Sequence, residues 1–118
     1  MVLLFLSRQN GGVVDRLRYA DVRPYVVPDT LSELAGPLSG VVELPTHLAW
    51  SGLRCFDLKD ERQIDLLYET VIRESMDIAD LDRYLNAAVL HQVWLRLWLP
   101  ARVRWAWEQR FPSLTRVA

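Results

Sequence analysis

The feature that most constrains the fold is an apolar stripe with helical spacing between residues 60 and 74. Five apolar side chains recur there at offsets of 0, 3, 4, 7 and 8. They are Ile64, Leu67, Tyr68, Val71 and Ile72. This spacing places all five on one face of an α-helix. Asp60 is a suitable N-cap, with Gln63 at the third helical position. The segment therefore predicts an amphipathic helix that begins after Asp60.

Three more helices are predicted by the sequence that follows. Asp77 and Asn86 are natural N-caps, and Pro100 suits the first turn of a last helix that Pro112 ends. The apolar stripes of the first two are Ile78, Leu81 and Leu85, then Val89, Leu90, Val93, Trp94 and Leu97. Residues 57–118 are therefore expected to form a small helical domain of about four short helices joined by short links.

The first half of the chain, residues 1–56, is predicted to be an extended arm. Pro24 and Pro28 each push the preceding residue towards extended geometry. Such a segment has little to bury alone but is able to wrap across another protein. The expected fold class is thus mainly α, with an extended, proline-punctuated N-terminal arm and at most short strands.

One short helix and one short strand are expected to interrupt this arm. The helix is predicted at about residues 29–35, where Thr30 and Glu33 have the spacing of a capping box. The segment 41–44 is prone to form a strand, and Pro45 ends that strand or leaves it at a sheet edge. We expect this strand to be available for pairing with another chain.

Length and composition favour one small cytoplasmic domain. The chain has 118 residues, and its hydrophobic and charged fractions of 51% and 25% lie near the averages of globular proteins. The single cysteine, Cys55, excludes an internal disulfide and suits a reducing cytoplasm. The opening stretch MVLLFLS is too short for a membrane-spanning helix and lacks the basic start of a signal peptide. No membrane partner is expected.

Charge is distributed unevenly, although the net charge is only -1. Residues 1–56 carry five basic and five acidic side chains. Residues 57–85 carry four basic and nine acidic side chains, a net charge of -5, and residues 86–118 carry five basic and one acidic, a net charge of +4. Two interpretations remain open: an acidic helix pairs with a basic helix inside the molecule, or a basic patch binds an acidic partner.

The residue types that catalysis and metal binding need are scattered. His47, His91 and Cys55 do not supply the three or four ligands of a metal site at suitable spacing. Asp77 is explained as an N-cap, and the two aspartates that follow it as first-turn residues favoured by the helix dipole. The sequence also has neither of the glycine-rich patterns that bind phosphate groups. We expect no metal, no cofactor and no enzymatic activity.

The segment from Trp94 to Leu114, here called the Trp–Arg segment, raises the main functional question. It holds four of the five tryptophans and four arginines. Trp94 and Trp98 share one face if their helix continues. Trp105 and Trp107 point about 160° apart on a helical wheel, so one of them is expected to be exposed or to face a partner. These tryptophans either fill the core or form an interface, since Trp and Arg are enriched at interface hot spots.

Direct DNA recognition is the weaker alternative for this segment. Arg102, Arg104 and Arg110 do not form one stripe on the last helix. A recognition helix normally carries short polar side chains that contact bases, whereas this helix carries tryptophans. The alternative function is therefore a DNA-binding transcriptional regulator that uses the Arg-rich C-terminal helix, and nucleic acid is a less favoured partner.

Three stretches of the chain resemble a family of small actinobacterial proteins. They are SELAGPLSGVVELPTHLAWSG, FDLKDERQIDLLYETVIRES and LWLPARVRWAWEQRFPSL. The family is characterised by an L-P-x-x-L-x-W loop, a D-L-x-D…L-Y-E-x-V-x-R-E helix and a closing L-P-x-x-V-R-x-A-W-E segment. The matching positions are Trp50, Tyr68, Trp94, Leu99, Pro100, Val103, Arg104, Trp107 and Glu108. The resemblance covers about residues 31–114.

These proteins are the antitoxin side of toxin–antitoxin pairs whose toxin is an AbiEii-like (MenT-like) nucleotidyltransferase. The resemblance implies an antitoxin that neutralises its toxin by binding, with no chemistry of its own. Longer antitoxins of such systems have an N-terminal winged helix that binds the operator. No such pattern is recognisable in this sequence, so the resemblance does not imply autoregulation.

The expected function is therefore that of an antitoxin that binds and neutralises a cognate nucleotidyltransferase toxin by protein–protein contact. The predicted partner-binding residues are Trp50, Trp94, Trp98, Arg102, Arg104, Trp105, Trp107 and Arg110. In this hypothesis the segment with net charge -5 contacts a basic surface of the toxin, and the segment with net charge +4 contacts an acidic surface. A third possibility is that the Trp–Arg segment is the seam of a homodimer.

Overall fold

A computed structural model describes residues 26–49 and 54–115 of the chain. Its elements in chain order are η1 (Leu31–Glu33), β1 (Val41–Glu43), β2 (Cys55–Asp57), α2 (Glu61–Glu74), α3 (Ile78–Tyr84), α4 (Ala87–Val93), η2 (Trp94–Arg96), α5 (Ala101–Arg110) and η3 (Pro112–Thr115). Within the described residues the fold is mainly α, with four α-helices and one small two-stranded sheet, as the sequence predicts. The predicted extended path around Pro24 lies outside the described residues, as does Trp50.

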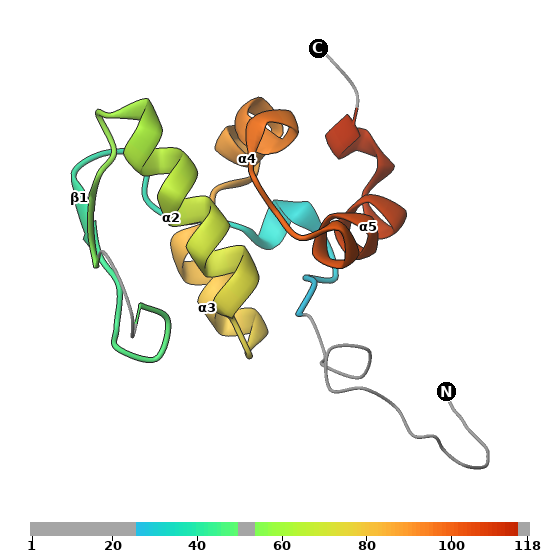
Figure 1. Cartoon of the computed structure of the whole chain (residues 1–118), viewed down its shortest axis with the longest axis horizontal. Helices are drawn as coiled ribbons and strands as arrows, with labels where there is room; N and C mark the ends of the chain where they lie inside the picture. Colours follow the sequence, from blue (N-terminus) through green and yellow to red (C-terminus); the bar gives the residue numbers. More distant parts are fainter. Residues whose placement is uncertain (1–25, 50–53, 116–118) are drawn as a thin grey trace.

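The helices lie around a single hydrophobic core. Figure 1 shows the β1–β2 hairpin and α2 at one end of the long axis and α5 at the other, with α4 and η1 between them. Helix α3 packs against α2. The largest fully buried side chains of the core include Trp94, Trp107, Tyr68 and Phe56. None of the helices in the described ranges has the length and hydropathy needed to span a bilayer.

The predicted N-caps are confirmed. The side chains of Asp60, Asp77 and Asn86 each accept a hydrogen bond from the backbone N–H two residues later, at 2.9–3.0 Å. These bonds satisfy donors that the first helical turn leaves without intrahelical partners. Pro100 immediately precedes α5, which ends at Arg110, before Pro112. Short polar residues and prolines therefore set the helix ends as expected.

The apolar stripe of α2 faces the core. Leu67, Tyr68, Val71 and Ile72 are buried, and Ile64 is partly buried against the same core. Burial on this scale contributes roughly 1.5–3 kcal/mol for each large apolar side chain relative to leaving it in water. The periodicity of the sequence therefore determines how α2 is oriented.

The short helix expected at residues 29–35 is reduced to the three residues of η1. The side chain of Thr30 makes no capping bond to the backbone and lies instead 3.3 Å from the hydroxyl of Ser32. The backbone beyond η1 bonds to the link between α3 and α4: Gly36 N–H donates to the carbonyl of Leu85 at 2.7 Å. The helix prediction was wrong in extent because these tertiary bonds take the groups that a longer helix would use.

Gly36 stands where the chain passes closest to this link. A Cβ atom on residue 36 would lie 2.6 Å from the backbone carbonyl carbon of Tyr84. Real Cβ atoms do not approach backbone that closely, so only glycine fits without a shift of the η1 segment. The predicted stop at Gly36 thus has a tertiary cause as well as a local one.

The predicted strand exists as β1, but it pairs within the chain. β1 is antiparallel to β2, with Val42 opposite Phe56. The expected pairing with another chain is therefore corrected to pairing within this chain. β2 was not predicted from the sequence. Val42 and Phe56 are both buried, so the hairpin joins the core by the side chains of its central residues. The alternation that marks a strand cannot be read from three residues.

The core extends across the boundary expected at residue 57. Leu34, Leu44, Leu48 and Phe56 are buried in the same cluster as the helical side chains. The described part of the N-terminal half is therefore packed on the helices. It holds the β1–β2 hairpin against α2 at one end of the molecule.

Candidate protein-binding surface

The chain changes direction between α4 and α5, and this separates Trp94 from Trp98. Helix α4 ends at Val93, η2 covers the next three residues, and Leu97 has extended backbone geometry. Trp94 is 0% exposed and Trp98 is 78% exposed. The two tryptophans therefore do not share a helical face, because the helix does not continue through them.

Two tryptophans of the Trp–Arg segment form part of the core. The ring centroids of Trp94 and Trp107 are 5.8 Å apart, and those of Trp107 and Phe111 are 6.2 Å apart. Val103, one turn before Trp107 on α5, is also fully buried. Aromatic pairs at such distances add to the energy of burial itself. Trp94 and Trp107, predicted from the sequence as partner-binding residues, are thus core residues of the free chain.

Trp105 lies on the opposite side of α5. Its side chain is 65% exposed, whereas Trp107 is 0% exposed. The prediction that one of these two tryptophans is exposed is confirmed. The physical reason is their separation on the helical wheel, since a helix on the surface of a small core can bury only one of two opposed faces.

Arg104 and Glu108 bind the segment before α5 to the helix itself. The guanidinium of Arg104 donates to the carbonyl oxygens of Trp94 and Leu97 and lies over the Trp94 ring, 5.0 Å from its centroid. Arg104 also pairs with Glu108 at 3.3 Å. A carboxylate oxygen of Glu108 accepts the indole N–H of Trp94 at 2.8 Å. The side chain of Arg104 is therefore engaged inside the molecule and is not presented to a partner.

Two carboxylates of α2 hold the same segment from the other side. Arg96 donates from Nε to both carboxylate oxygens of Asp65 at 3.0 Å. The backbone N–H of Trp98 donates to Oε2 of Glu69 at 2.8 Å. Asp65 and Glu69 are four residues apart and therefore share one face of α2. The contact between Asp65 and Arg96 also supports the interpretation that acidic and basic segments pair inside the molecule.

The remaining predicted arginines lie on the surface of α5. Arg110 pairs with Asp29 at 3.2 Å, and both side chains are at least half exposed. Arg102 is exposed. The arginines of α5 therefore do not gather on one basic face, since Arg104 is turned inward and Arg110 has an acidic neighbour. This distribution offers little for a DNA backbone, which is bound by clustered cations.

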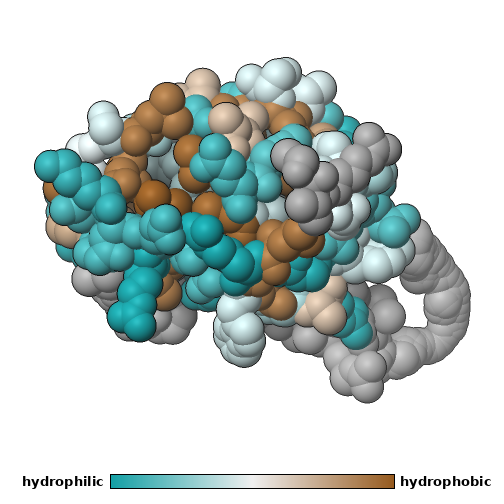
Figure 2. Space-filling model, turned by 90° about the horizontal axis from the view of Figure 1, so that it is seen from above, coloured by the Kyte–Doolittle hydropathy of each residue, from teal (hydrophilic) through white to brown (hydrophobic). Residues whose placement is uncertain are grey.

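The exposed apolar side chains include two that the sequence analysis did not single out. Leu95, beside Arg96, and Leu66, beside Asp65, are 55% and 47% exposed. Figure 2 shows hydrophobic side chains reaching the surface between hydrophilic ones on the side where α2 lies in Figure 1. Leu66 lies off the apolar stripe of α2, and that departure was the available signal.

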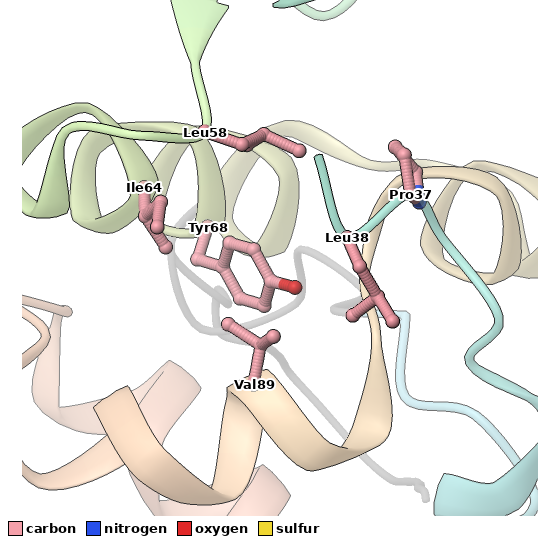
Figure 3. A pocket seen from close by; sticks show the side chains of 6 residues that line it. All are labelled: Pro37, Leu38, Leu58, Ile64, Tyr68 and Val89. Atoms are coloured by element: carbon pink, nitrogen blue, oxygen red, sulfur yellow. The ribbon is translucent and has the colours of Figure 1, made fainter. Parts of the chain in front are cut away.

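A small pocket lies where α2, α4 and the segments before β1 and after β2 meet, and it holds about 180 Å³ of space including open solvent. The lining residues are Pro37, Leu38, Leu58, Ile64, Tyr68 and Val89. Figure 3 shows the ring of Tyr68 between Ile64, Leu38 and Val89. Its hydroxyl accepts the backbone N–H of Asn86 at 2.9 Å, and burial raises the pKa of Tyr68 above its ordinary value. The other five lining side chains are apolar, so the Tyr68 hydroxyl is the polar side-chain group of the lining.

The two histidines and the cysteine lie apart from one another. Nε2 of His47 lies 3.2 Å from a carboxylate oxygen of Asp80, which ties the loop after β1 to α3. Cys55 is exposed on β2. Among residues 26–49 and 54–115, no three His, Cys, Asp or Glu side chains form a group that could hold a metal ion.

No protein-family model, no curated protein and no solved structure matches this sequence. The resemblance to small antitoxins therefore rests on the motifs quoted above. Among the described residues, the tryptophans that are mostly exposed are Trp98 and Trp105.

Proposed function

We propose that this protein is an antitoxin that binds a nucleotidyltransferase toxin of the AbiEii-like type by protein–protein contact and thereby keeps it inactive. The observation that carries the proposal is the exposure of two indole rings, 78% for Trp98 and 65% for Trp105, in a protein of only 118 residues. Large exposed aromatic side chains are costly to hydrate and are typical anchors of protein interfaces. The family resemblance supplies the identity of the partner.

Preorganisation supports a binding role for Trp98. Its backbone N–H is bonded to Glu69, and Arg104 holds the residue before it by a backbone carbonyl. A side chain presented from a fixed backbone loses less conformational entropy on binding than one presented from a mobile loop. Trp105 projects from the middle turns of α5, which is also a rigid support.

The buried and exposed positions change the set of partner-binding residues that the sequence predicted. Trp98, Trp105 and Leu95 supply its apolar anchors, and Arg102 and Arg110 its rim. The core residues Trp94 and Trp107 act by holding the segment that carries these anchors. A protein–protein mode is favoured over DNA binding because Arg104 is consumed by internal contacts.

The experiment is co-purification of the tagged chain with its neighbouring gene products at high salt, followed by an assay of nucleotidyl transfer. We expect a nucleotidyltransferase in near-stoichiometric amount, inactive in the complex and active when freed. High salt discriminates between the two classes of partner because phosphate contacts weaken steeply with salt and aromatic-anchored contacts do not.

Substitutions at the anchors test the surface itself. Trp98→Ala and Trp105→Ala are each expected to weaken the complex by about 2 kcal/mol or more with the far-UV circular dichroism unchanged. Met76→Ala is the matched control, since Met76 is 63% exposed but belongs to the link between α2 and α3. Recovery of the chain alone, or an equal loss in all three variants, would refute the proposal.

A further inference from the structure

Trp98 carries an exposed aromatic ring on a backbone position that is bonded to a carboxylate. Its backbone N–H donates to Oε2 of Glu69 at 2.8 Å, while its side chain is 78% exposed. The other oxygen of this carboxylate, Oε1, has no hydrogen-bond partner among the described residues. The exposed indole is therefore carried by a backbone position that is bonded to a carboxylate with one oxygen still available.

The neighbouring cations are engaged elsewhere. Arg96, two residues before Trp98, gives its Nε–H to both oxygens of Asp65. Arg73, one turn after Glu69 on α2, donates to Glu74 at 3.2 Å.

We propose that Trp98 and Glu69 form a receptor for an arginine side chain on a basic surface of the partner. The guanidinium stacks on the exposed indole and donates to Oε1 of Glu69, which the bond to the Trp98 N–H leaves available. A planar cation is the group that satisfies both neighbours, since it has a flat face for the ring and N–H donors at its edge for the carboxylate.

The carboxylate of Glu69 selects the chemistry of the partner. Its negative charge attracts a cationic side chain and disfavours an acidic one. This inference rests on the proposed function for the identity of the partner but not for its own test. Both parts of the receptor, the Trp98 ring and the Glu69 carboxylate, are in this chain, so the test needs no toxin.

The test is a titration of the 118-residue protein with a tetra-arginine peptide whose ends are blocked. NMR of the tryptophan indole N–H resonances follows binding. We expect a saturable shift of the Trp98 indole resonance and of the Trp98 backbone amide, with the Trp105 resonance unaffected. A tetra-lysine peptide is expected to bind about two- to five-fold more weakly, because an ammonium group does not stack on the ring.

Variants separate the two parts of the receptor. Glu69→Gln keeps a side-chain oxygen that can accept the Trp98 N–H but removes the negative charge, and we expect affinity for the peptide to fall about two- to five-fold. Trp98→Leu removes the indole resonance, so this variant is followed at the backbone amide of residue 98, and we expect the saturable shift of that amide to be lost. Trp105→Leu is the matched control and is expected to bind the peptide as the unmodified chain does.

Three results would overturn the inference. They are the absence of a saturable shift at Trp98, equal affinity for a tetra-norleucine peptide, and equal loss in the Trp105→Leu and Trp98→Leu variants. Failure here is distinguishable from failure of the proposed function. A toxin complex that depends on Trp98 while the peptide does not bind would refute the arginine receptor alone. Peptide binding without recovery of a toxin would refute the antitoxin alone.

Discussion

The inner and outer sides of the Trp–Arg segment differ in how the same residue types are used. On the inner side, Trp94 and Trp107 are fully buried and their rings lie 5.8 Å apart. On the outer side, Trp98 and Trp105 are mostly exposed. The arginines divide in the same way, since Arg104 is bound to inner carbonyl groups. One short stretch of sequence therefore contains both a half that is buried in the core and a half that is exposed to solvent.

A cluster of tryptophans in a sequence is therefore not necessarily one functional unit. The inner tryptophans add apolar area to a small core, which a chain of this size needs for stability. The outer tryptophans add no comparable burial to the free chain and leave apolar surface in water. That cost is offset only if something covers them, which is the physical basis of the proposed interface.

The largest effect on stability is expected at a buried tryptophan of the inner side. Trp107→Ala should lower the free energy of unfolding by about 3–5 kcal/mol, because it removes a fully buried indole and leaves a cavity. Trp105→Ala on the same helix should lower it by less than about 0.5 kcal/mol. Urea unfolding followed by circular dichroism measures both. Similar losses in the two variants would contradict the division into inner and outer sides.

A smaller effect is expected at the arginines. Arg104→Met should lower the free energy of unfolding by about 2 kcal/mol, since it removes bonds to two backbone carbonyl groups and leaves Glu108 without its cation. Arg110→Met removes an exposed pair with Asp29 and should cost less than about 0.5 kcal/mol. The shift in urea midpoint compares them. An Arg110 variant as destabilised as the Arg104 variant would show that both arginines are structural.

The smallest effect extends the comparison to α2 and depends on pH. Tyr68→Phe should lower the free energy of unfolding by about 1 kcal/mol, because the Asn86 N–H loses its acceptor. Burial raises the pKa of Tyr68 above 10.0, so the folded state holds the phenolic proton more tightly than the unfolded state. The protein should therefore lose stability as pH rises above about 10.

Thermal unfolding between neutral pH and pH 11 or so tests this dependence. The Tyr68→Phe variant should show a shallower alkaline loss than the unmodified chain. Tyr84→Phe is the control, and that variant should retain the alkaline loss. A Tyr68→Phe variant with an unchanged alkaline slope would show that another group controls it.

Much of the helical half was predictable from the sequence. Asp60, Asp77 and Asn86 cap helices through bonds to residues two positions away, and such local bonds depend little on the rest of the molecule. The hairpin was only half predictable. β2 is three residues long, and its position is decided by Phe56, which is buried opposite Val42. Pairing between residues so far apart in the chain leaves no local signal.

The candidate surface was less predictable than the fold. The opposition of Trp105 and Trp107 followed from their spacing on one helix, whereas the separation of Trp94 from Trp98 did not. That separation required the end of α4 at Val93, which is followed by internal bonds from Arg104 to the carbonyl groups of Trp94 and Leu97. Contacts with Asp65 and Glu69 of α2, which lie 31 and 29 residues from their partners Arg96 and Trp98, completed the arrangement.

The sequence by itself determined which segments become helices, where they begin, and which face of α2 is buried, because periodicity and capping act over a few residues. The tertiary structure alone decided that Trp94 faces inward while Trp98 faces outward beside Glu69. The physical reason is that a side chain's environment depends on contacts between elements remote in the chain. Here those contacts are the bonds from α2 and α5 to one short connecting segment.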